Sequence, residues 1–177
     1  MKIFYDTEFL DDGKTIDLIS IGMVAEDGRE LYAVSSEFDQ GAVRRHGWLM
    51  ANVWPSLPIK KNPAGQRGMD QLDLAHPDVR PRKQIARLVA AFIGDTPAPD
   101  LWAYYSAYDH VALAQLWGPM SDLPSWIPMQ TCDLVQEAKR LGVTPADMPT
   151  QADGHHNALA DARHNRVMAK YLDSVAR

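Results

Sequence analysis

The chain has 177 residues, enough for one domain with a sizeable hydrophobic core, and we expect residues 1–177 to form a single domain. Hydrophobic residues make up 46% and charged residues 23%, a composition that excludes a disordered, collagen-like or coiled-coil chain. The net charge of −5 argues against a protein that holds nucleic acid by bulk electrostatics. It does not exclude a nucleic-acid enzyme, because carboxylates at a metal site also count in this charge.

The sequence offers no signal for export or for a membrane. Asp6 and Glu8 come too soon to leave an apolar leader segment, and the apolar runs at residues 18–25 and 88–94 are too short to span a bilayer. The single cysteine, Cys132, excludes an intramolecular disulfide and suits a reducing compartment. As a lone cysteine it is expected to be a small core residue rather than a nucleophile. We therefore expect a cytoplasmic protein with no membrane partner.

The first part of the chain predicts three strands joined by tight turns. Apolar residues dominate residues 3–9, 16–25 and 30–36, and an Asp-Gly pair lies in each connection between them. Strands linked in this way form an antiparallel meander. The second strand is apolar almost throughout, which indicates that helices cover both faces of the sheet.

The region from about residue 39 to residue 81 shows little pattern. Prolines and glycines interrupt every long periodic run, and only a short helix at residues 41–50 is expected. An irregular stretch of this length within one domain is often a binding loop, a lid or an oligomer contact.

The second half alternates helices and short strands. Helical spacing of apolar residues recurs at residues 82–93, 109–117, 134–141 and 157–175, and short strands are expected at residues 100–105 and 129–134. The resulting order predicts an α/β domain. It has one mixed five-stranded sheet, antiparallel in its first three strands, with helices on both faces.

Two acids stand side by side in the opening strand. Because a strand alternates its faces with a period of 2, Asp6 and Glu8 project from one face and Thr7 from the other. Neighbouring carboxylates repel each other unless a cation or a shared proton offsets the repulsion. Oxygen ligands suit a hard divalent ion such as Mg²⁺ or Mn²⁺. The alternative is a strand end whose acids point to water.

Further acidic and basic side chains follow at two helix starts. Asp109 comes where the 100–105 strand gives way to a helix, so it could instead cap that helix. Asp161 lies one turn inside the last helix, and His156 stands just before it, next to a second histidine, His155. Small residues in this helix, Ala158 among them, allow it to lie close to the sheet.

This combination of acids and a histidine resembles the DEDDh family of 3′→5′ exonucleases, which has an RNase H-like fold and uses two divalent ions. The order and spacing of Asp6, Glu8, Asp109, His156 and Asp161 fit that family along the whole chain. Within it, the mycobacterial RNase AS branch, which holds homodimeric exoribonucleases that prefer polyadenylate 3′ ends, is similar over residues 4–9, 19–30, 107–113 and 115–120.

The resemblance implies a role for each of these residues. Asp6, Glu8, Asp109 and Asp161 correspond to ligands of two Mg²⁺ or Mn²⁺ ions, and His156 corresponds to the general base. The five-residue spacing to Asp161 favours His156 over its neighbour as the base. The expected partners are the 3′ end of single-stranded RNA and a second copy of the chain, and the expected products are nucleoside 5′-monophosphates. Plausible contacts for the terminal nucleotide come from residues beside the ligands, namely Thr7, Phe9 and Tyr108.

Other functions stay open at this point. The same five residues could serve an exonuclease that acts on DNA or on small oligonucleotides. A module that binds RNA or nucleotides without turnover is a non-enzymatic alternative, although the complete set of motif residues weighs against it. An RNase H-type endonuclease would share the acidic strand and the metals, but it would not require His156 at this position.

Overall fold

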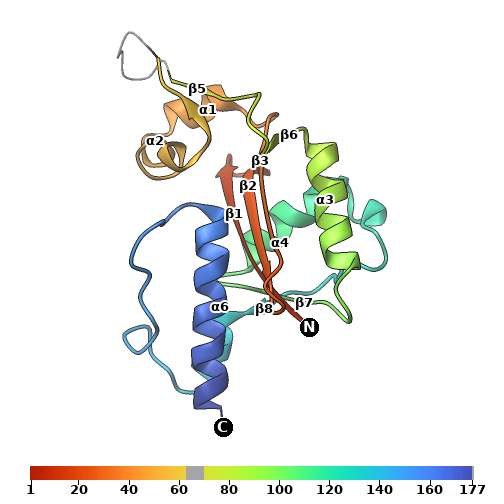
Figure 1. The fold of residues 1–177 in the computed structure, drawn as a ribbon, viewed down its shortest axis with the longest axis vertical. Helices are drawn as coiled ribbons and strands as arrows, with labels where there is room; N and C mark the ends of the chain where they lie inside the picture. The colour runs from red at the N-terminus through yellow and green to blue at the C-terminus, as the bar shows by residue number, and fades with distance from the viewer. Residues whose placement is uncertain (63–69, 177) are drawn as a thin grey trace.

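The computed structural model describes residues 1–62 and 70–176. Its centre is a six-stranded sheet of mixed direction, in the order β6-β3-β2-β1-β7-β8. The strands of this sheet are β1 (Lys2–Asp11), β2 (Ile16–Ala25), β3 (Glu30–Ser35), β6 (Val79–Arg80), β7 (Asp100–Ala103) and β8 (Cys132–Asp133). β1 lies inside the sheet between β2 and β7, and helices on both faces of the sheet cover its side chains (Figure 1).

The predicted antiparallel meander of the first three strands is confirmed. β1 pairs with β2 from Ile3 opposite Ala25 to Asp11 opposite Ile16, and β2 pairs antiparallel with β3. The sheet has six strands where five were predicted, because β6 also joins it, parallel to β3. β6 has only two residues, too few for an alternating pattern to reveal it in the sequence.

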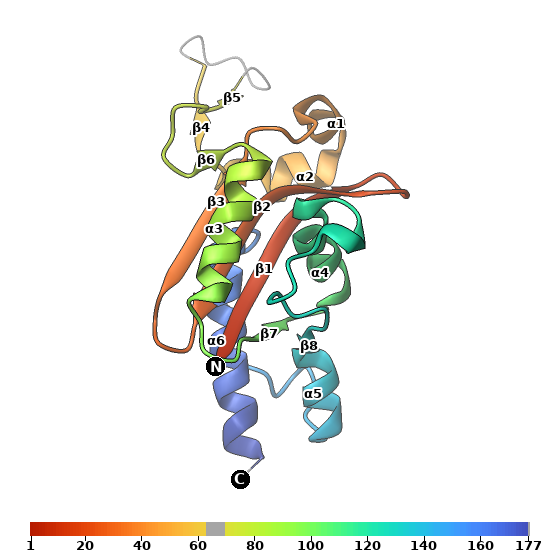
Figure 2. The ribbon, with the colours of Figure 1, turned by 90° about the vertical axis from the view of Figure 1, so that its right-hand side faces the viewer.

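Helices cover both faces of the sheet, as predicted. The longer helices are α3 (Arg82–Gly94), α4 (Ala107–Ala114), α5 (Leu134–Arg140) and α6 (Ala158–Val175). Short 3₁₀ turns, η2 (Gln115–Trp117) and η3 (Met120–Asp122), follow α4. α6 lies along one face and α3 along the other (Figures 1 and 2). Among the described helices, none combines the length and the apolar character needed to cross a membrane.

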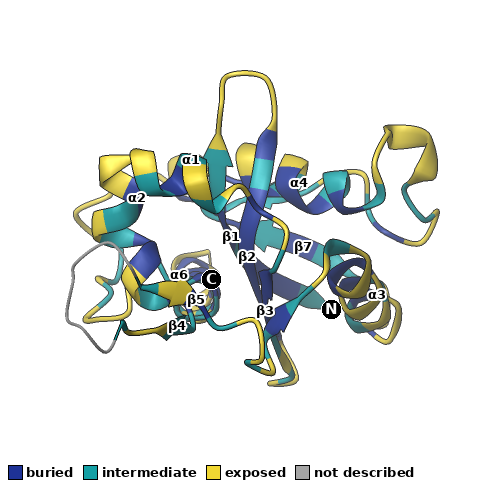
Figure 3. Cartoon of the chain, turned by 90° about the horizontal axis from the view of Figure 1, so that it is seen from above, coloured by how far each residue is buried: buried dark blue, intermediate teal, exposed yellow. Residues whose placement is uncertain are grey.

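The alternation of β1 divides the interior into two cores. Ile3 and Tyr5 pack on one face with Val89 of α3, whereas Phe4 packs on the other face with Leu172 of α6. Seen from above, β1 and β2 are dark with buried residues between helices whose outer faces are exposed (Figure 3). The period of 2 in the sequence therefore decides which β1 side chains face α6.

α6 lies very close to the sheet. A Cβ atom built on Gly22 of β2 would stand 2.3 Å from the main chain of Ala158, so only glycine fits there. Ala158 and Ala162 are fully buried, as their small size predicts. One turn further on, the buried amide of Asn165 donates to the main-chain carbonyl of Tyr5 in β1 at 2.9 Å. These contacts fix the start of α6 beside the acidic part of β1.

The region after β3 forms a small unit beyond the end of the sheet (Figure 1). It contains α1 (Gln40–Arg45), α2 (Gly47–Asn52), η1 (Trp54–Ser56) and a two-stranded ribbon, β4 (Ile59–Lys60) with β5 (Gln71–Leu72). The single helix predicted at residues 41–50 is two helices, because His46 has an extended main chain and caps the second one. The prolines and glycines expected to break structure within residues 63–69 lie outside the described residues.

Candidate active site

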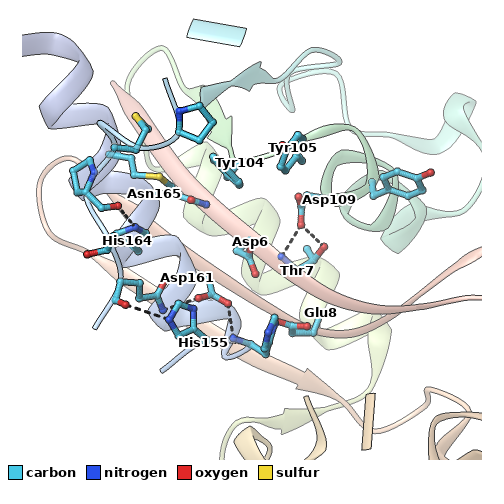
Figure 4. A pocket seen from close by; sticks show the side chains of 18 of the residues that line it. Asp6, Thr7, Glu8, Tyr104, Tyr105, Asp109, His155, Asp161, His164 and Asn165 are labelled. Carbon is cyan, nitrogen blue, oxygen red and sulfur yellow. Dashed lines mark hydrogen bonds between the residues drawn. The ribbon is translucent and has the colours of Figure 1, made fainter. Parts of the chain in front are cut away.

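A cavity of about 540 Å³ is bounded by β1, α4, the start of α6 and the loop before it. It is lined by all eight side chains that the sequence singled out: Asp6, Thr7, Glu8, Phe9, Tyr108, Asp109, His156 and Asp161. β1, the first turn of α4 and the first turn of α6 supply its acids. Figure 4 shows Asp6 between Asp161 on one side and the Thr7–Asp109 pair on the other. The fold thus brings together residues from three distant parts of the sequence.

Asp109 is tied to β1 rather than acting as a helix cap. Its Oδ1 accepts hydrogen bonds from the main-chain N–H of Thr7 at 2.8 Å and from the Thr7 hydroxyl at 2.7 Å. The N-cap of α4 is Ser106, three residues earlier. The capping alternative is therefore wrong, and the hydroxyl and amide of Thr7 already serve to orient Asp109. Whether Thr7 also contacts substrate stays a prediction.

Asp161 is held by two donors from the loop before α6. The Gln151 side-chain amide donates to Oδ1 at 2.7 Å, and the main-chain N–H of His156 donates to Oδ2 at 2.9 Å. Potential ligand atoms of Glu8, His156 and Asp161 all lie within 4.8 Å of one another. Gln151 was missed in the sequence, because nothing in a loop residue ten positions from Asp161 indicates this contact.

His156 has an unusual main chain. Its φ of 61° lies in the left-handed region, where a non-glycine residue is strained by about 1–3 kcal/mol, and such strained residues cluster at functional sites. The Ser56 hydroxyl donates to its carbonyl oxygen at 2.6 Å, and the Trp48 ring meets its ring edge-on with centroids 4.8 Å apart. The neighbouring His155 instead places Nε2 3.2 Å from the carbonyl of Gln151. His155 also lines the cavity, but His156 is the histidine whose ring nitrogen lies within 4.8 Å of carboxylate oxygens of Glu8 and Asp161.

The acids of this cavity repel one another in a partly dehydrated space. Burial and, next, the Asp109 carboxylate raise the pKa of Asp6 well above its usual value. Burial and the Asp161 carboxylate raise the pKa of Glu8 to about 8. Burial raises the pKa of Asp109 to about 6 although its bonds to Thr7 oppose this. Perturbed carboxyl groups gathered in a cleft are typical of functional sites.

The residues fit a divalent cation site. In the described part of the chain, none of the four carboxylates forms an ion pair with a lysine or arginine. All the carboxylate donors are oxygen atoms, which suit hard cations such as Mg²⁺ or Mn²⁺. A bound cation would offset the mutual repulsion that raises the pKa of Asp6 and Glu8.

Aromatic side chains surround the acids. Phe9 and Tyr108 stack with centroids 5.9 Å apart and planes inclined by 13°, and Tyr108 is more than half exposed. Tyr104 and Tyr105 also line the cavity and meet edge-to-face at 4.7 Å. Tyr105, like His156, has a positive φ, here 56°. Asp153-Gly154 marks a turn just before His156, but the sequence does not show which residue of that turn takes the positive φ.

Comparison with known proteins identifies the class. A family model for the 3′-5′ exoribonuclease Rv2179c-like domain matches residues 64–172, a stretch that includes Asp109, His156 and Asp161. The chain therefore belongs to the Rv2179c-like family of 3′-5′ exoribonucleases, which are phosphodiester hydrolases.

Individual relatives extend the likeness to nearly the whole chain. The 3′-5′ exoribonuclease Rv2179c of Mycobacterium tuberculosis strain H37Rv is 47% identical over 165 residues, which cover 92% of this chain and 88% of the relative. The 3′-5′ exoribonuclease MT2234.1 of strain CDC 1551 matches with the same figures. A solved structure of the yeast NOT1 MIF4G domain co-crystallised with CAF1 also matches over 98% of this chain and 80% of the other. Its TM-score is 0.46 at 12% identity.

Proposed function

We propose that this chain removes nucleotides one at a time from the 3′ end of single-stranded RNA by metal-dependent hydrolysis. Asp6, Glu8, Asp109 and Asp161 hold two divalent cations, Mg²⁺ or Mn²⁺, and His156 is the general base. The observation that carries the proposal is the convergence of four carboxylates and this histidine in one cavity. Membership in the DEDDh group and its RNase AS branch, with an RNase H-like fold, is part of the same proposal.

The chain's own residues position the water and the phosphate. When bound, the cations supply charge stabilisation for the phosphate group and for the leaving oxygen. His156 takes the proton of the attacking water at a ring nitrogen, while Asp161 and Ser56 hold its main chain. The water oxygen bonds to phosphorus as the bond from phosphorus to the 3′ oxygen of the preceding nucleotide breaks. That oxygen takes a proton from solvent, and a nucleoside 5′-monophosphate leaves.

The aromatic rings support binding of the terminal nucleotide. Phe9 and the exposed Tyr108 offer flat faces on which any base can stack, so they contribute affinity more than base selection. Preference for A-rich tails rests on the resemblance to the RNase AS branch alone. The homodimer and the cytoplasmic location also stay predictions.

A time course on end-labelled homopolymers tests the proposal. With 5′-labelled RNA and Mg²⁺, the chain is expected to produce a ladder that shortens by one nucleotide, and EDTA should abolish it. Asp6→Asn and His156→Ala should each lower kcat by at least about 100-fold, because a positioned general base alone contributes 10²–10⁴-fold. Glu137→Gln, on a half-buried acid of α5 that pairs with Arg140 away from the cavity, is the matched control. Chelator-resistant trimming, or full activity in either site variant, would contradict the mechanism.

The same experiment separates the alternatives. DNA homopolymers with the same labels test the alternative that the chain is an exonuclease acting on DNA or on small oligonucleotides. The sugar is distinguished by contacts to the ribose 2′-OH. Equal rates on RNA and DNA would favour the broader exonuclease. Binding of RNA without any release of mononucleotides would favour a module that has lost turnover.

A further inference from the structure

A second cavity adjoins the candidate active site. Its volume is about 410 Å³, and it lies between α5 and the chain that follows this helix. It is lined by Tyr104, Val135, Ala138, Lys139, Gly142, Val143, Thr144, Pro145 and Met148. Tyr104, Pro145 and Met148 also line the acidic cavity, so the two spaces share a wall. Figure 4 places Tyr104 on the side of the acidic cavity opposite Glu8. A polymer whose end lies among the acids can therefore continue into this second space.

The wall of the second cavity is suited to a flat apolar group. Val135 and Ala138 of α5 and Val143 and Met148 of the following loop line the cavity with apolar side chains. Ala138 also belongs to the hydrophobic cluster that contains Leu172, and Val143 and Met148 pack against that cluster. The half-buried ring of Tyr104 adds an aromatic surface where the two cavities meet. Its volume falls within the range of about 300–1,000 Å³ that is usual for small-molecule sites.

The second cavity is also lined by a lysine, Lys139. Lys139 is exposed and forms no ion pair among the described residues. Its neighbour Arg140, by contrast, binds both carboxylate oxygens of Glu137 at 2.7 and 2.8 Å. The Thr144 hydroxyl is also committed, since it donates to Asp147 at 2.6 Å. Among the described residues that line this cavity, Lys139 therefore has a charged side chain that can bind an anion.

We propose that the second cavity is a nucleobase subsite that holds an upstream base of the RNA, with Lys139 on the adjoining phosphate. An apolar and aromatic slot beside a free ammonium matches the two parts of a nucleotide, the base and its phosphate. This inference rests on the exoribonuclease function proposed above. It adds that the chain binds an upstream nucleotide as well as the terminal one, so its affinity for RNA depends on the length of the substrate. Stacking in such a slot tolerates every base, so the gain in affinity is independent of sequence.

Substrates of two lengths test the subsite. One is an RNA decamer, and the other is the p-nitrophenyl ester of adenosine 5′-monophosphate, which contains a single nucleotide. Lys139→Ala is expected to raise KM for the decamer about 3- to 10-fold with kcat unchanged, and to leave hydrolysis of the ester unaltered. The dependence of log KM for the decamer on log salt concentration should also weaken by about 0.7, one phosphate contact on a single strand. Lys83→Ala, on an exposed lysine of α3 on the other face, is the control.

A binding measurement without turnover completes the test. In an Asp6→Asn background, fluorescence anisotropy of labelled decamer should show weaker binding after Val135→Phe, which fills the slot, and after Lys139→Ala. Unchanged decamer affinity in both variants would overturn the subsite. A Val135→Phe chain that changes its native mass would also overturn it, by assigning the cavity to a contact between copies. If the unaltered chain hydrolyses neither substrate, it is the exoribonuclease proposal that fails.

Discussion

The hydroxyl of Ser56 donates to the main-chain carbonyl of His156, one hundred positions away, at 2.6 Å, and the carbonyl of Val53 at 2.8 Å competes for the same proton. The Asn157 side-chain amide donates to the carbonyl of Ser56 at 3.4 Å, and the Trp48 ring packs edge-to-face against the His156 ring. The unit formed by α1, α2 and η1, whose sequence shows so little pattern, therefore holds the loop that carries His156. We infer that this unit positions His156 for its proposed role as the base.

Removing the Ser56 hydroxyl should loosen His156 without unfolding the chain. Ser56→Ala is expected to lower kcat about 3- to 10-fold with little change in KM, the effect of losing one hydrogen bond that orients the base. Steady-state kinetics on an RNA decamer measure both constants. Ser174→Ala is a matched control, since Ser174 makes the same kind of bond to the carbonyl of Tyr171 near the end of α6. A rise in KM with unchanged kcat would instead assign Ser56 to substrate binding.

The close packing of α6 on β2 should tolerate no side chain at Gly22. Gly22→Ala places a Cβ 2.3 Å from the main chain of Ala158, so α6 must move away from the sheet and carry Asp161 with it. Overpacking of this kind costs about 1–3 kcal/mol, which lowers Tm by roughly 2–12 °C in a chain of this size. Thermal unfolding followed by circular dichroism measures the shift. Gly47→Ala is the control, because no atom lies within 4 Å of a Cβ there.

The acidic cavity should make the chelated protein less stable as pH rises. Burial and the Asp161 carboxylate raise the folded-state pKa of Glu8 from 4.5 to about 8. The protonated carboxyl therefore stabilises the fold fully below pH 4.5, and this contribution is lost as pH rises towards 8. In EDTA, we expect Tm to fall by on the order of 10 °C between pH 5 and pH 8.

Two comparisons isolate Glu8 as the cause of that fall. Glu8→Gln, which cannot ionise, should flatten the dependence of Tm on pH. Glu137→Gln should not, because the Arg140 guanidinium holds the pKa of Glu137 below its usual value and the group is already charged at pH 5. Added Mg²⁺ should raise Tm more at pH 8 than at pH 5, since cations bind the ionised carboxylates. A flat profile for the unaltered chelated protein would contradict the predicted repulsion.

Cys132 should react slowly with alkylating reagents. Burial, followed by the Asp100 carboxylate that accepts from its thiol at 3.5 Å, raises the pKa of Cys132 to about 11. At pH 8 the thiolate is then only about 0.1% of the total, against about 10% for a thiol of pKa 9, so alkylation should be at least about tenfold slower. Iodoacetamide labelling followed by mass spectrometry measures the rate, and Asp100→Asn should increase it. Rapid labelling of the unaltered chain would show a reactive thiol.

Local patterns predicted much of this protein. The period of 2 in β1 placed Asp6 and Glu8 on one face and assigned Thr7 to the other, and helical spacing located α3 and α6 to within a residue or two. Asp161 lies in the first turn of α6 as expected. These properties follow from dihedral preferences and side-chain periodicity, which neighbouring residues determine.

Only the tertiary structure decided how distant segments meet. β6 joins the sheet through two residues, Ser56 reaches His156, and Gln151 reaches Asp161, although no local pattern marks any of these contacts. The use of Asp109 to bind Thr7, rather than to cap α4, likewise depends on how α4 packs on β1. Each contact depends on the packing of whole elements across the sheet. The sequence thus indicated the acids and the histidine. The packing of α6, α4 and the α1–α2 unit around β1 decided which side chains hydrogen-bond to them.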